Sequence, residues 1–369
     1  MKLAITHDWL TVPGGAEKVI KRWYDMYPES LIHTTVFDKK RIGHIFDEKR
    51  VVPSFMQKIP FSQKHYTKML SLMPRAFEEF DLGAYDVVLS SSSSCAKGVL
   101  TGPDSVHIAY IHSPMRYAWD LYHNYYRTAG LLARFMMRRT MPQIRQWDVI
   151  NSTRIDHLIA NSNFIARRIK KYYRREADVI FPPVDTEFYT PGTGNGDDYY
   201  LILSRFVPYK KIDMAIEACN KMKRRLVVIG GGSQERELRE MAGPTIEFSG
   251  IIDDEKVREY YRNCRAFLFP GLEDFGITAV EAQACGRPVI AFGRGGALDT
   301  VLPGKTGILF QEQNTEMLIQ AIEEFEKVQW DSKIIREHAE SFSNERFDRE
   351  IAAYVSEKWE IRKKEIGLS

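Results

Sequence analysis

The chain has 369 residues, of which 44% are hydrophobic and 27% are charged. Its length exceeds the roughly 250–300 residues that one hydrophobic core supports, and therefore predicts two domains. The composition is that of an ordinary globular protein and excludes a disordered chain. The formal net charge of +3, from 52 basic and 49 acidic residues, argues against a protein that wraps nucleic acid.

The sequence contains no apolar run of the roughly 18–20 residues that a transmembrane helix needs. The N-terminal stretch "MKLAITHDWL" turns polar at His7 and Asp8, too early for the apolar region of a signal peptide. We therefore expect a cytoplasmic chain, or one that is peripheral on the cytoplasmic face of the inner membrane.

Short apolar runs alternate with helical patterns through the first half of the chain. Residues 2–6 predict a strand, Gly14 and Gly15 a turn, and residues 16–27 an amphipathic helix. Further short strands are predicted at residues 31–37, 86–91, 107–112 and 157–161. The serine run from Ser90 to Ser94 follows a strand and is interpreted as a loop.

The second half repeats this pattern, with strands predicted at residues 199–204, 225–230, 246–250, 266–270, 288–292 and 307–310. Nearly continuous apolar strands separated by helices are typical of parallel sheets covered on both faces. The fold class is therefore α/β, with two doubly wound, Rossmann-like domains facing a central cleft. The Gly- and Pro-containing segment 190–200 is interpreted as a linker.

Glycines at the ends of predicted strands are the first candidate ligand contacts. Gly14 and Gly15 precede the first helix, and Gly230, Gly231 and Gly232 end the strand "RLVVIG". Glycines in such places let backbone N–H groups approach an anion at a helix start. Neither run fits a dinucleotide or Walker motif, and a plain tight turn is an equal alternative.

Two cations follow the first strand of the second half. Arg205 and Lys210 lie in "SRFVPYKKID", between a strand and a helix. A guanidinium can donate two parallel hydrogen bonds to a phosphate, and a lysine ammonium adds a compact positive charge, so the two residues are suited to bind a pyrophosphate. An ordinary solvated loop is the alternative.

Two glutamates stand eight residues apart in "GLEDFGITAVEAQACG". Glu273 lies in a predicted loop, and Glu281 lies inside a helix that begins near Gly276. Glu281 is surrounded in sequence by apolar residues, which is unusual for a merely solvated charge. We interpret the two carboxylates as hydroxyl-binding groups rather than as a loop acid and a surface acid.

This stretch resembles the E-x7-E signature of the retaining nucleotide-sugar glycosyltransferases of family 4 (glycosyltransferases group 1), which have the GT-B fold. The Gly-Gly turn, "SRFVPYKK", "IGGG" and "GRGGALDTVLPGKTGILF" extend the resemblance in the same order over nearly the whole chain. Within the family, the sequence is most similar to bacterial mannosyltransferases of O-antigen-type surface polysaccharide assembly.

The resemblance implies a role for each candidate residue. Arg205 and Lys210 would hold the donor diphosphate, and Glu281 the ribose hydroxyls. Glu273 would hold hydroxyls of the transferred sugar, together with the backbone amides of Phe275 and Gly276. Gly15 would close over the donor, and His112 in "YIHSPMRY" would face the transferred sugar. The remaining implied donor contacts are Gly14, Ser204, Gly231 and Ile277.

The family often has glycine before the arginine and after the lysine, where this chain has Ser204 and Lys211. Ser204 is a mild change at a strand end. Lys211 adds positive charge near the phosphates, and its side chain bears on the conformation of the loop.

The resemblance also implies a division of labour between domains. Residues 1–183 would form the acceptor-binding domain and residues 184–348 the nucleotide-sugar-binding domain. Residues 349–369 would form a helix that packs back on the first domain, although the sequence alone is equally compatible with a dimerisation helix.

The implied reaction is retaining transfer of a hexose, with mannose from GDP-mannose as the expected donor, to a glycan or lipid-linked glycan in surface polysaccharide biosynthesis. No Asp-x-Asp occurs, and the four cysteines are scattered and expected to be buried free thiols. We therefore expect no metal and no cofactor. A UDP-sugar donor, a nucleotide-sugar epimerase or a non-catalytic sugar-nucleotide-binding protein are the alternatives.

Two sequence features bear on partners. The helix "NFIARRIKKYYRR" predicts a basic face that either rests on an anionic membrane surface or is simply solvated. The aromatic residues of "HSPMRYAWDLYHNYYR" either stack on an acceptor sugar or form a packed wall. No nucleic-acid partner is expected, and the chain is expected to be a monomer or a homodimer.

Overall fold

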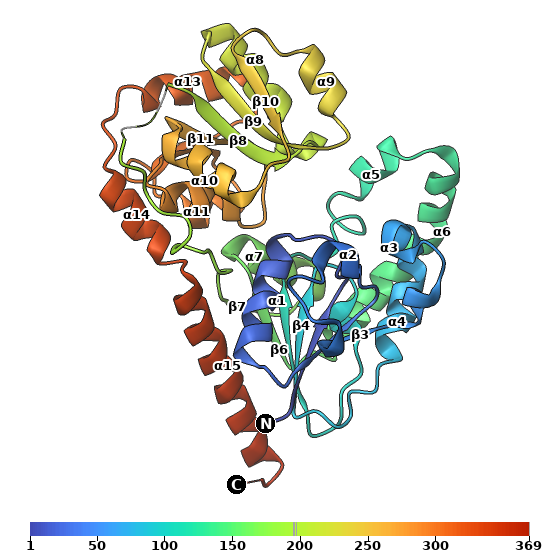
Figure 1. The fold of residues 1–369 in the computed structure, drawn as a ribbon. Helices are drawn as coiled ribbons and strands as arrows, with labels where there is room; N and C mark the ends of the chain where they lie inside the picture. The colour runs from blue at the N-terminus through green and yellow to red at the C-terminus, as the bar shows by residue number, and fades with distance from the viewer. Residues whose placement is uncertain (195, 197, 369) are drawn as a thin grey trace. The chain divides into compact units, whose positions relative to one another are not determined.

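The computed structural model of the chain describes residues 1–194, 196 and 198–368. The chain divides into two compact units, each an α/β structure built on one parallel sheet (Figure 1). Unit 1 comprises residues 1–181 and 347–369, and unit 2 comprises residues 182–346.

The sheet of unit 1 has seven parallel strands in the order β3-β2-β1-β4-β5-β6-β7. The strands are β1 (Leu3–His7), β2 (Leu31–Thr34), β3 (Val51–Pro53), β4 (Val87–Ser92), β5 (Val106–Ile111), β6 (His157–Ala160) and β7 (Asp178–Val179). The strand order reverses direction between β1 and β4, so the crevice at their carboxyl ends is the switch point of this sheet.

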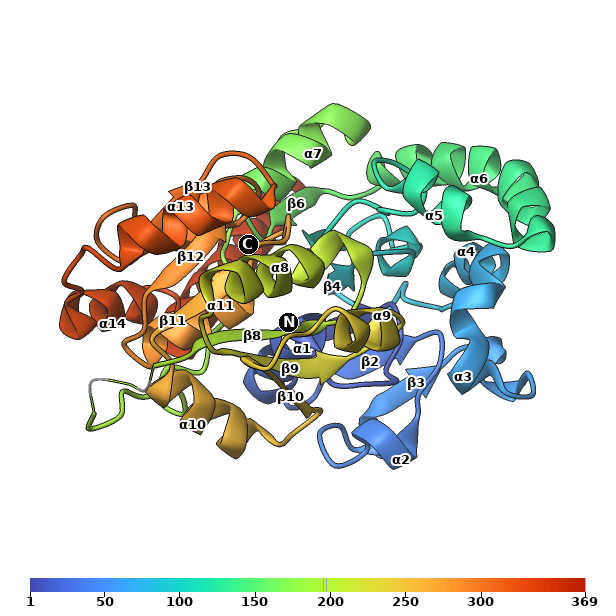
Figure 2. The same cartoon turned by 90° about the horizontal axis from the view of Figure 1, so that it is seen from above.

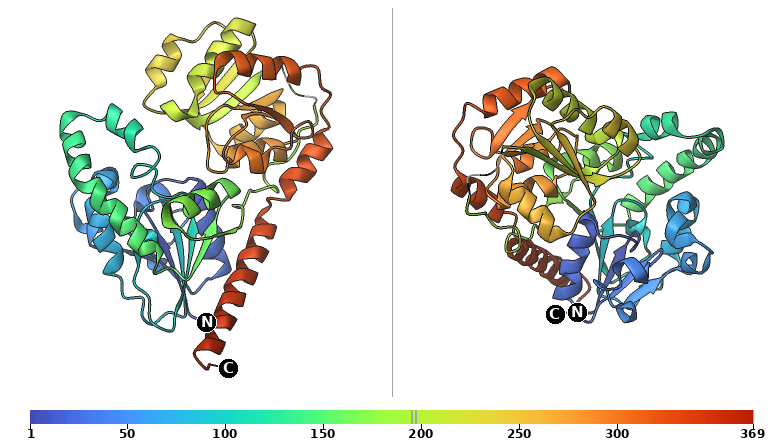
Figure 3. Two further views of the ribbon diagram at one scale, coloured as in Figure 1. Left: turned by 180° about the vertical axis from the view of Figure 1, so that it is seen from behind. Right: turned by 45° about the horizontal axis from the view of Figure 1, so that its top comes forward.

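Both faces of this sheet are covered, which explains why its central strands are apolar on both sides. On one face, α1 (Gly15–Met26) and α15 (Asn344–Glu365) pack on β1, β4 and β5 through Trp23, Phe347 and Ile351. Figure 3 shows α1 and α15 side by side, as the bond between Arg22 and Asp348 also requires. The C-terminal helix thus belongs to the core of unit 1.

The opposite face carries α4 (Met73–Glu78), α6 (Leu131–Ser152) and α7 (Asn163–Tyr173). Met141 and Ile144 of α6 join the α4 cluster, while Ile165 and Ile169 of α7 pack beside β5 and β6. The other helices of unit 1 are α2 (Lys39–Ile42), α3 (Ser62–His65) and α5 (Tyr122–Thr128).

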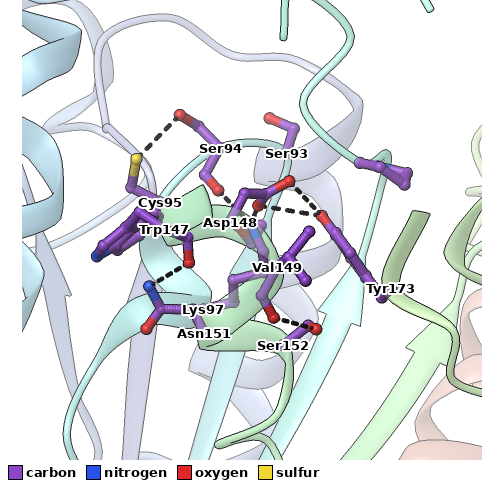
Figure 4. Close-up of polar contacts among 12 residues, drawn as sticks. Ser93, Ser94, Cys95, Lys97, Trp147, Asp148, Val149, Asn151, Ser152 and Tyr173 are labelled. Atoms are coloured by element: carbon purple, nitrogen blue, oxygen red, sulfur yellow. Dashed lines mark hydrogen bonds and ion pairs between the residues drawn. The ribbon is translucent and has the colours of Figure 1, made fainter. Parts of the chain in front are cut away.

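A buried ion pair ties α6 to the segment that follows β4. Lys97 Nζ lies 2.6 Å from Asp148 Oδ1, and both side chains are almost fully buried. Figure 4 shows Tyr173 pointing at the same carboxylate, to which its hydroxyl donates over 3.1 Å. Trp119 Nε1 also donates to Oδ2 of Asp148 over 2.7 Å, so each oxygen of the buried carboxylate has a donor.

The sheet of unit 2 has six parallel strands in the order β10-β9-β8-β11-β12-β13. The strands are β8 (Tyr200–Arg205), β9 (Leu226–Gly231), β10 (Ile246–Gly250), β11 (Ala266–Phe269), β12 (Val289–Phe292) and β13 (Gly307–Phe310). The order reverses between β8 and β11, which places the switch point of unit 2 there.

Helices cover both faces of this sheet as well. On one face, α8 (Ile212–Met222) and α13 (Thr315–Phe325) lie side by side over Tyr200, Val228 and Ile290 (Figure 2). On the other face, Tyr261 of α10 (Asp254–Asn263) packs on Phe267 with ring centroids 5.6 Å apart. The remaining helices are α9 (Glu235–Glu240), α11 (Ile277–Ala284), α12 (Ala297–Thr300) and α14 (Ser332–Glu340).

Every predicted strand is present, but β3 and β7 were not predicted, because three and two residues are too few for a periodic signal. The interpretation of Ser90–Ser94 as a loop is wrong for its first three residues, since β4 runs through Ser92. These buried hydroxyls are tolerated because the sheet supplies partners, such as Thr6 for Ser90 at 2.9 Å.

The segment 190–200, interpreted as a linker, lies within unit 2 in its described part, while residues 195 and 197 are outside the described residues. Arg262 donates to the carbonyl of Thr190 over 2.8 Å, and Arg287 donates to that of Gly194 over 2.8 Å. These bonds hold the segment against the end of α10.

Candidate functional site

The candidate donor residues of unit 2 lie at the carboxyl edge of its sheet, around the switch point. Arg205 is the last residue of β8, and Lys210 ends the short 3-10 helix η5 (Pro208–Lys210) that follows it. Glu273 lies in the loop after β11, on the other side of the switch point. Open parallel sheets bind their ligands in this crevice.

Lys210 and Glu273 form an ion pair across the switch point. The two side chains are only 18% and 12% exposed, so water screens their attraction weakly. Gly271 makes this approach possible, because a Cβ at residue 271 would lie 3.0 Å from the Cα of Lys210. The structure therefore brings these two predicted residues together through a close backbone contact.

The loop between β12 and α12 contacts the backbone of Glu273 and Phe275. The backbone N–H of Gly296 donates to the carbonyl oxygen of Glu273 over 2.9 Å. A Cβ at residue 296 would lie 2.3 Å from Cα of Phe275, and Gly295 has φ of +71°. These glycines were not among the predicted site residues, although "GRGG" directly after a strand is a signal for a tight turn at a ligand-binding edge.

Helix α11 begins where the sequence predicted. Gly276 is its N-cap with φ of +100°, a conformation that favours glycine, and a Cβ there would touch the ring of Phe269. The ring of buried Phe275 packs against Phe342, and Ile277 is half-buried at the first position of the helix. The N–H groups at the start of a helix give this end of α11 a positive partial charge.

Glu281 lies inside the second turn of α11 and is only 2% exposed. The hydroxyl of Tyr261 donates to its carboxylate over 3.2 Å. Burial, with Glu281 as the next cause, raises the pKa of Tyr261 well above its ordinary value, so this hydroxyl stays a donor. The carboxylate therefore has a structural partner in α10, and its binding of a ribose stays a prediction.

Arg205 and Lys211, at the end of β8 and in the loop after it, differ in exposure and backbone conformation. Arg205 is exposed, and its guanidinium donates to the hydroxyl of Tyr209 over 3.0 Å. The hydroxyl of Ser204 donates weakly, over 3.3 Å, to the carbonyl of Arg205. Lys211 has φ of +57°, a left-handed conformation that costs a non-glycine residue about 1 kcal/mol or more. The loop thus keeps the backbone shape that favours glycine, with a lysine in its place.

The glycine run after β9 lies next to this loop. Gly231 pairs with Arg205 in the sheet, and its neighbours Gly230 and Gly232 have φ of +131° and +158°. A Cβ at residue 232 would lie 2.6 Å from the carbonyl oxygen of Phe206. The run is therefore required by the close approach of two backbones, and its contact with a donor stays a prediction.

In unit 1, the predicted glycines lie at the switch point between β1 and β4. Gly14 is the N-cap of α1, and Gly15 is its first residue. A Cβ at residue 14 would lie 2.8 Å from Oε2 of Glu17, so the glycine leaves room for this buried carboxylate at the helix start. Glu17 is a buried acid that was not among the predicted site residues.

His112 follows β5 and belongs to a chain of hydrogen bonds that reaches Glu17. Nε2 of His112 lies 2.7 Å from Oγ of Ser91, and the same Oγ lies 3.1 Å from Nδ1 of His7. Nε2 of His7 lies 3.5 Å from Oε1 of Glu17. Burial, and next the neighbouring His7 ring, lowers the pKa of His112 to about 3, so the ring is neutral at pH 7.

This chain selects one tautomer of His112. Ser91 has a single hydroxyl hydrogen, so it donates to one ring and accepts from the other. Glu17 favours a hydrogen on Nε2 of His7, and Nδ1 of His7 accepts from Ser91 where it carries no hydrogen. Ser91 in turn accepts from Nε2–H of His112, which leaves Nδ1 of His112 as a hydrogen-bond acceptor.

Asp8, a second buried acid that was not predicted as a site residue, fixes the conformation of the loop after β4. The carboxylate of Asp8 accepts from the backbone N–H of Ser93 over 2.6 Å, of Ser94 over 2.9 Å and of Ala96 over 2.8 Å. Asp8 is 2% exposed, and its partners lie more than 80 residues away in sequence. It holds the carboxyl end of β4 in the position from which Ser91 reaches His112.

The aromatic residues after β5 pack against neighbouring side chains, and their stacking on an acceptor sugar stays a prediction. Tyr117 bonds Ser94 at 2.7 Å, and Trp119 stacks on Tyr172 with ring centroids 4.9 Å apart. These two rings form a packed wall. Tyr122 and Tyr126 stack on each other at 5.8 Å farther along.

The predicted site residues thus fall into two sets, one in each unit. Unit 1 holds His112, Gly14 and Gly15, while unit 2 holds the remaining ones around Lys210 and Glu273. The four cysteines are buried and free, as expected. Among the described residues, no group of three His, Cys, Asp or Glu side chains is placed to hold a metal ion.

Two family models match the chain, one after the other. Residues 13–188 match Glycosyltransferase Family 4, and residues 185–345 match Glycosyl transferases group 1. Each half of the chain thus matches the model of a glycosyltransferase domain. The second match contains Lys210, Glu273 and the start of α11, so the ion pair described above lies in the group 1 domain.

Curated relatives of these glycosyltransferase domains cover only part of the chain. An uncharacterized glycosyltransferase of Methanocaldococcus jannaschii is 29% identical over 198 residues, 52% of this chain and 56% of the relative. A D-inositol 3-phosphate glycosyltransferase of Nocardiopsis dassonvillei is 29% identical over 194 residues, with 44% and 45% covered. A GDP-mannose-dependent alpha-(1-6)-phosphatidylinositol monomannoside mannosyltransferase of Mycolicibacterium smegmatis is 32% identical over 170 residues, with 38% and 44% covered. The chain spans about half the length of these relatives.

The fold of these glycosyltransferase domains is also found in solved structures. HepE of Anabaena, in complex with UDP, has a TM-score of 0.72 and 16% identity, with 97% of this chain and 100% of HepE covered. The predicted GT-B architecture of two Rossmann-like α/β domains is thereby confirmed. Within the described residues, no helix is long and apolar enough to cross a membrane.

Proposed function

We propose that this chain transfers a hexose from a nucleotide sugar, with GDP-mannose as the donor, to a glycan or lipid-linked glycan acceptor of surface polysaccharide biosynthesis. The proposal rests above all on the Lys210–Glu273 ion pair at the switch point of the group 1 domain. A cation and a carboxylate at this crevice, beside a helix start, match the phosphates and hydroxyls of a sugar nucleotide.

In this proposal, the donor diphosphate replaces Glu273 as the partner of Lys210. Arg205, which is exposed at the end of β8, adds a second positive charge to the phosphates. The freed carboxylate of Glu273 then accepts hydrogen bonds from hydroxyls of the transferred sugar. The backbone N–H groups that begin α11 stabilise the charge that develops on the departing diphosphate.

We propose retention at the anomeric carbon, with the acceptor hydroxyl attacking on the face that the diphosphate leaves. The leaving oxygen would take the proton of that hydroxyl, and the protein would supply positioning and charge. Lys210 and Arg205 would neutralise the diphosphate without a metal ion, and no cofactor is proposed. Undiminished turnover in excess chelator supports this, and the anomer formed, read by NMR of the product, tests retention.

The donor is proposed from a relative whose name states GDP-mannose dependence and from the resemblance of the sequence to mannosyltransferases. The test compares GDP-mannose with UDP-glucose, UDP-GlcNAc and UDP-galactose. Thermal shift of the full chain reports binding, and nucleotide release reports turnover. A shift and turnover restricted to GDP-mannose support the proposal, and a clear preference for a UDP-sugar overturns the mannosyl assignment.

A UDP-sugar-dependent transferase is the second candidate, because the fold matches that of a protein crystallised with UDP. The same donor panel decides between the two. A matched variant, Glu273→Gln, keeps the size of the side chain but removes its charge. In both cases this variant should lose turnover, since either donor presents sugar hydroxyls to Glu273.

A further inference from the structure

Four exposed apolar side chains of unit 1 are concentrated at the start of α6. Leu131, Leu132, Phe135 and Met136 are 85%, 77%, 63% and 49% exposed. Single exposed apolar residues are ordinary, but four within six positions of one helix form a continuous patch. We call these four residues the α6 tip.

The α6 tip faces away from the core of unit 1. Met141 and Ile144 mark the inward side of α6, since both are buried against the α4 cluster. At 100° per residue, the four tip residues lie on the opposite side of the helix. Figure 1 and the left view of Figure 3 show the turn between α5 and α6 at the end of this hairpin that is remote from the sheet.

The hairpin that carries the tip is built to hold its shape. The guanidinium of Arg134 donates to the carbonyl of Tyr126 over 3.0 Å and to that of Arg127 over 2.7 Å. Because both carbonyls belong to α5, Arg134 fastens α6 to α5 from its inner side. The α6 tip therefore lies on a helical hairpin, α5–α6, whose two helices are held together by hydrogen bonds.

The charges around the tip have one sign. Residues 121–147 contain five arginines and no aspartate, glutamate or lysine. Arg138 and Arg139 are exposed directly after the tip residues. Apolar side chains flanked by cations match the interface of an anionic bilayer, where apolar groups enter the acyl boundary and cations meet the headgroups.

We propose that the α6 tip is a docking surface for an anionic lipid bilayer, with Leu131, Leu132 and Phe135 inserted and Arg138 and Arg139 on the headgroups. A second copy of the chain fits less well, because a two-fold contact places the patch against itself and arginine against arginine. The predicted basic face of α7 is weaker, since Lys170 is paired with Glu176 at 2.6 Å. The proposal does not rest on the donor, because its readout is lipid binding.

The test is flotation of the full chain with vesicles of phosphatidylcholine, with and without phosphatidylglycerol. We expect binding to the anionic vesicles that weakens with salt. Removing the apolar side chains in Leu131→Ser/Leu132→Ser/Phe135→Ser should lower partitioning about tenfold for each side chain. Arg138→Gln/Arg139→Gln should lower it about fivefold for each charge.

Two variants serve as matched controls. Ile251→Ser removes an isolated apolar side chain of unit 2 that is 87% exposed, and it should bind vesicles like the wild type. Lys170→Gln/Lys171→Gln removes the two lysines of the basic face of α7 and should have little effect. Circular dichroism and thermal melting establish that each variant is folded.

Three outcomes overturn the proposal. The first is that wild-type protein fails to bind anionic vesicles, and the second is that folded tip variants bind them as well as wild type. The third is a dimer of the wild-type chain without lipid that becomes monomeric in the tip variants. That last result would assign the α6 tip to a contact between copies.

Discussion

Oγ of Ser91 lies 2.7 Å from Nε2 of His112, at the centre of a hydrogen-bonded chain that runs from Glu17 to the histidine expected to face the transferred sugar. The two residues come from adjacent strands, β4 and β5. One serine hydroxyl thereby fixes which nitrogen of His112 carries the hydrogen.

We predict that Ser91→Ala destabilises unit 1 by about 1–3 kcal/mol, because it leaves buried ring nitrogens of His7 and His112 without a partner. It should also mix the tautomers of His112, which nitrogen NMR of the histidine ring reports. The neighbouring change Ser90→Ala is the matched control, since Ser90 bonds His107 at 2.6 Å. Unaltered ring shifts of His112 in Ser91→Ala would contradict the assignment.

The Lys210–Glu273 pair should show strong coupling in a double-mutant cycle. With both side chains less than one-fifth exposed, we expect about 1–3 kcal/mol between Lys210→Met and Glu273→Gln in urea unfolding. The exposed pair Arg236–Glu240, at 3.6 Å, is the control and should show at most about 0.5 kcal/mol. Equal coupling in the two pairs would show that the switch-point pair is solvated.

Gly296→Ala tests the support behind Glu273. Gly296 has ordinary helical dihedrals, so the effect of a methyl group there is purely steric. A Cβ 2.3 Å from Cα of Phe275 must displace the loop, and we expect a loss of about 1–3 kcal/mol and weaker donor binding in thermal shift. In Gly194→Ala, the nearest atom among the described residues is 3.9 Å from the added methyl group, so stability and donor binding should be unchanged.

The pH dependence of stability should contain a contribution from buried His107. Burial, and next the charge of Arg175, lowers the pKa of His107 from 6.5 to about 3. Between about pH 3 and pH 6.5, His107 is protonated in the unfolded chain but stays neutral in the folded chain. Stability is therefore full above about pH 6.5 and falls on acidification, by up to about 1.4 kcal/mol per pH unit for this group.

Urea unfolding between pH 4 and pH 7 measures this contribution as the difference in slope between wild type and His107→Gln. His65→Gln replaces an exposed histidine and is the matched control. A slope in His107→Gln equal to that of wild type would mean that His107 does not stay neutral in the folded chain.

The strands and the start of α11 were predictable because their signals are local. Apolar runs of four to six residues mark β1, β5 and β8, and Gly276 marks the helix start by the conformation that only glycine adopts readily. The short β3 and β7 carry no such signal. The serines of β4 were misread because their partners lie 17 to 84 residues away.

The sequence by itself determined the α/β architecture, the family resemblance and the charged residues at strand ends. Each of these depends on residues that are close together in the sequence. Only the tertiary structure decided that Lys210 pairs with Glu273, that Tyr261 donates to Glu281 and that Ser91 joins His7 to His112. Strand order decides which loops become neighbours, and a pair of side chains 20 to 84 residues apart leaves no pattern in one sequence. The exposure of the α6 tip was also decided by packing, which buries Met141 and Ile144 and leaves the opposite side of the helix uncovered.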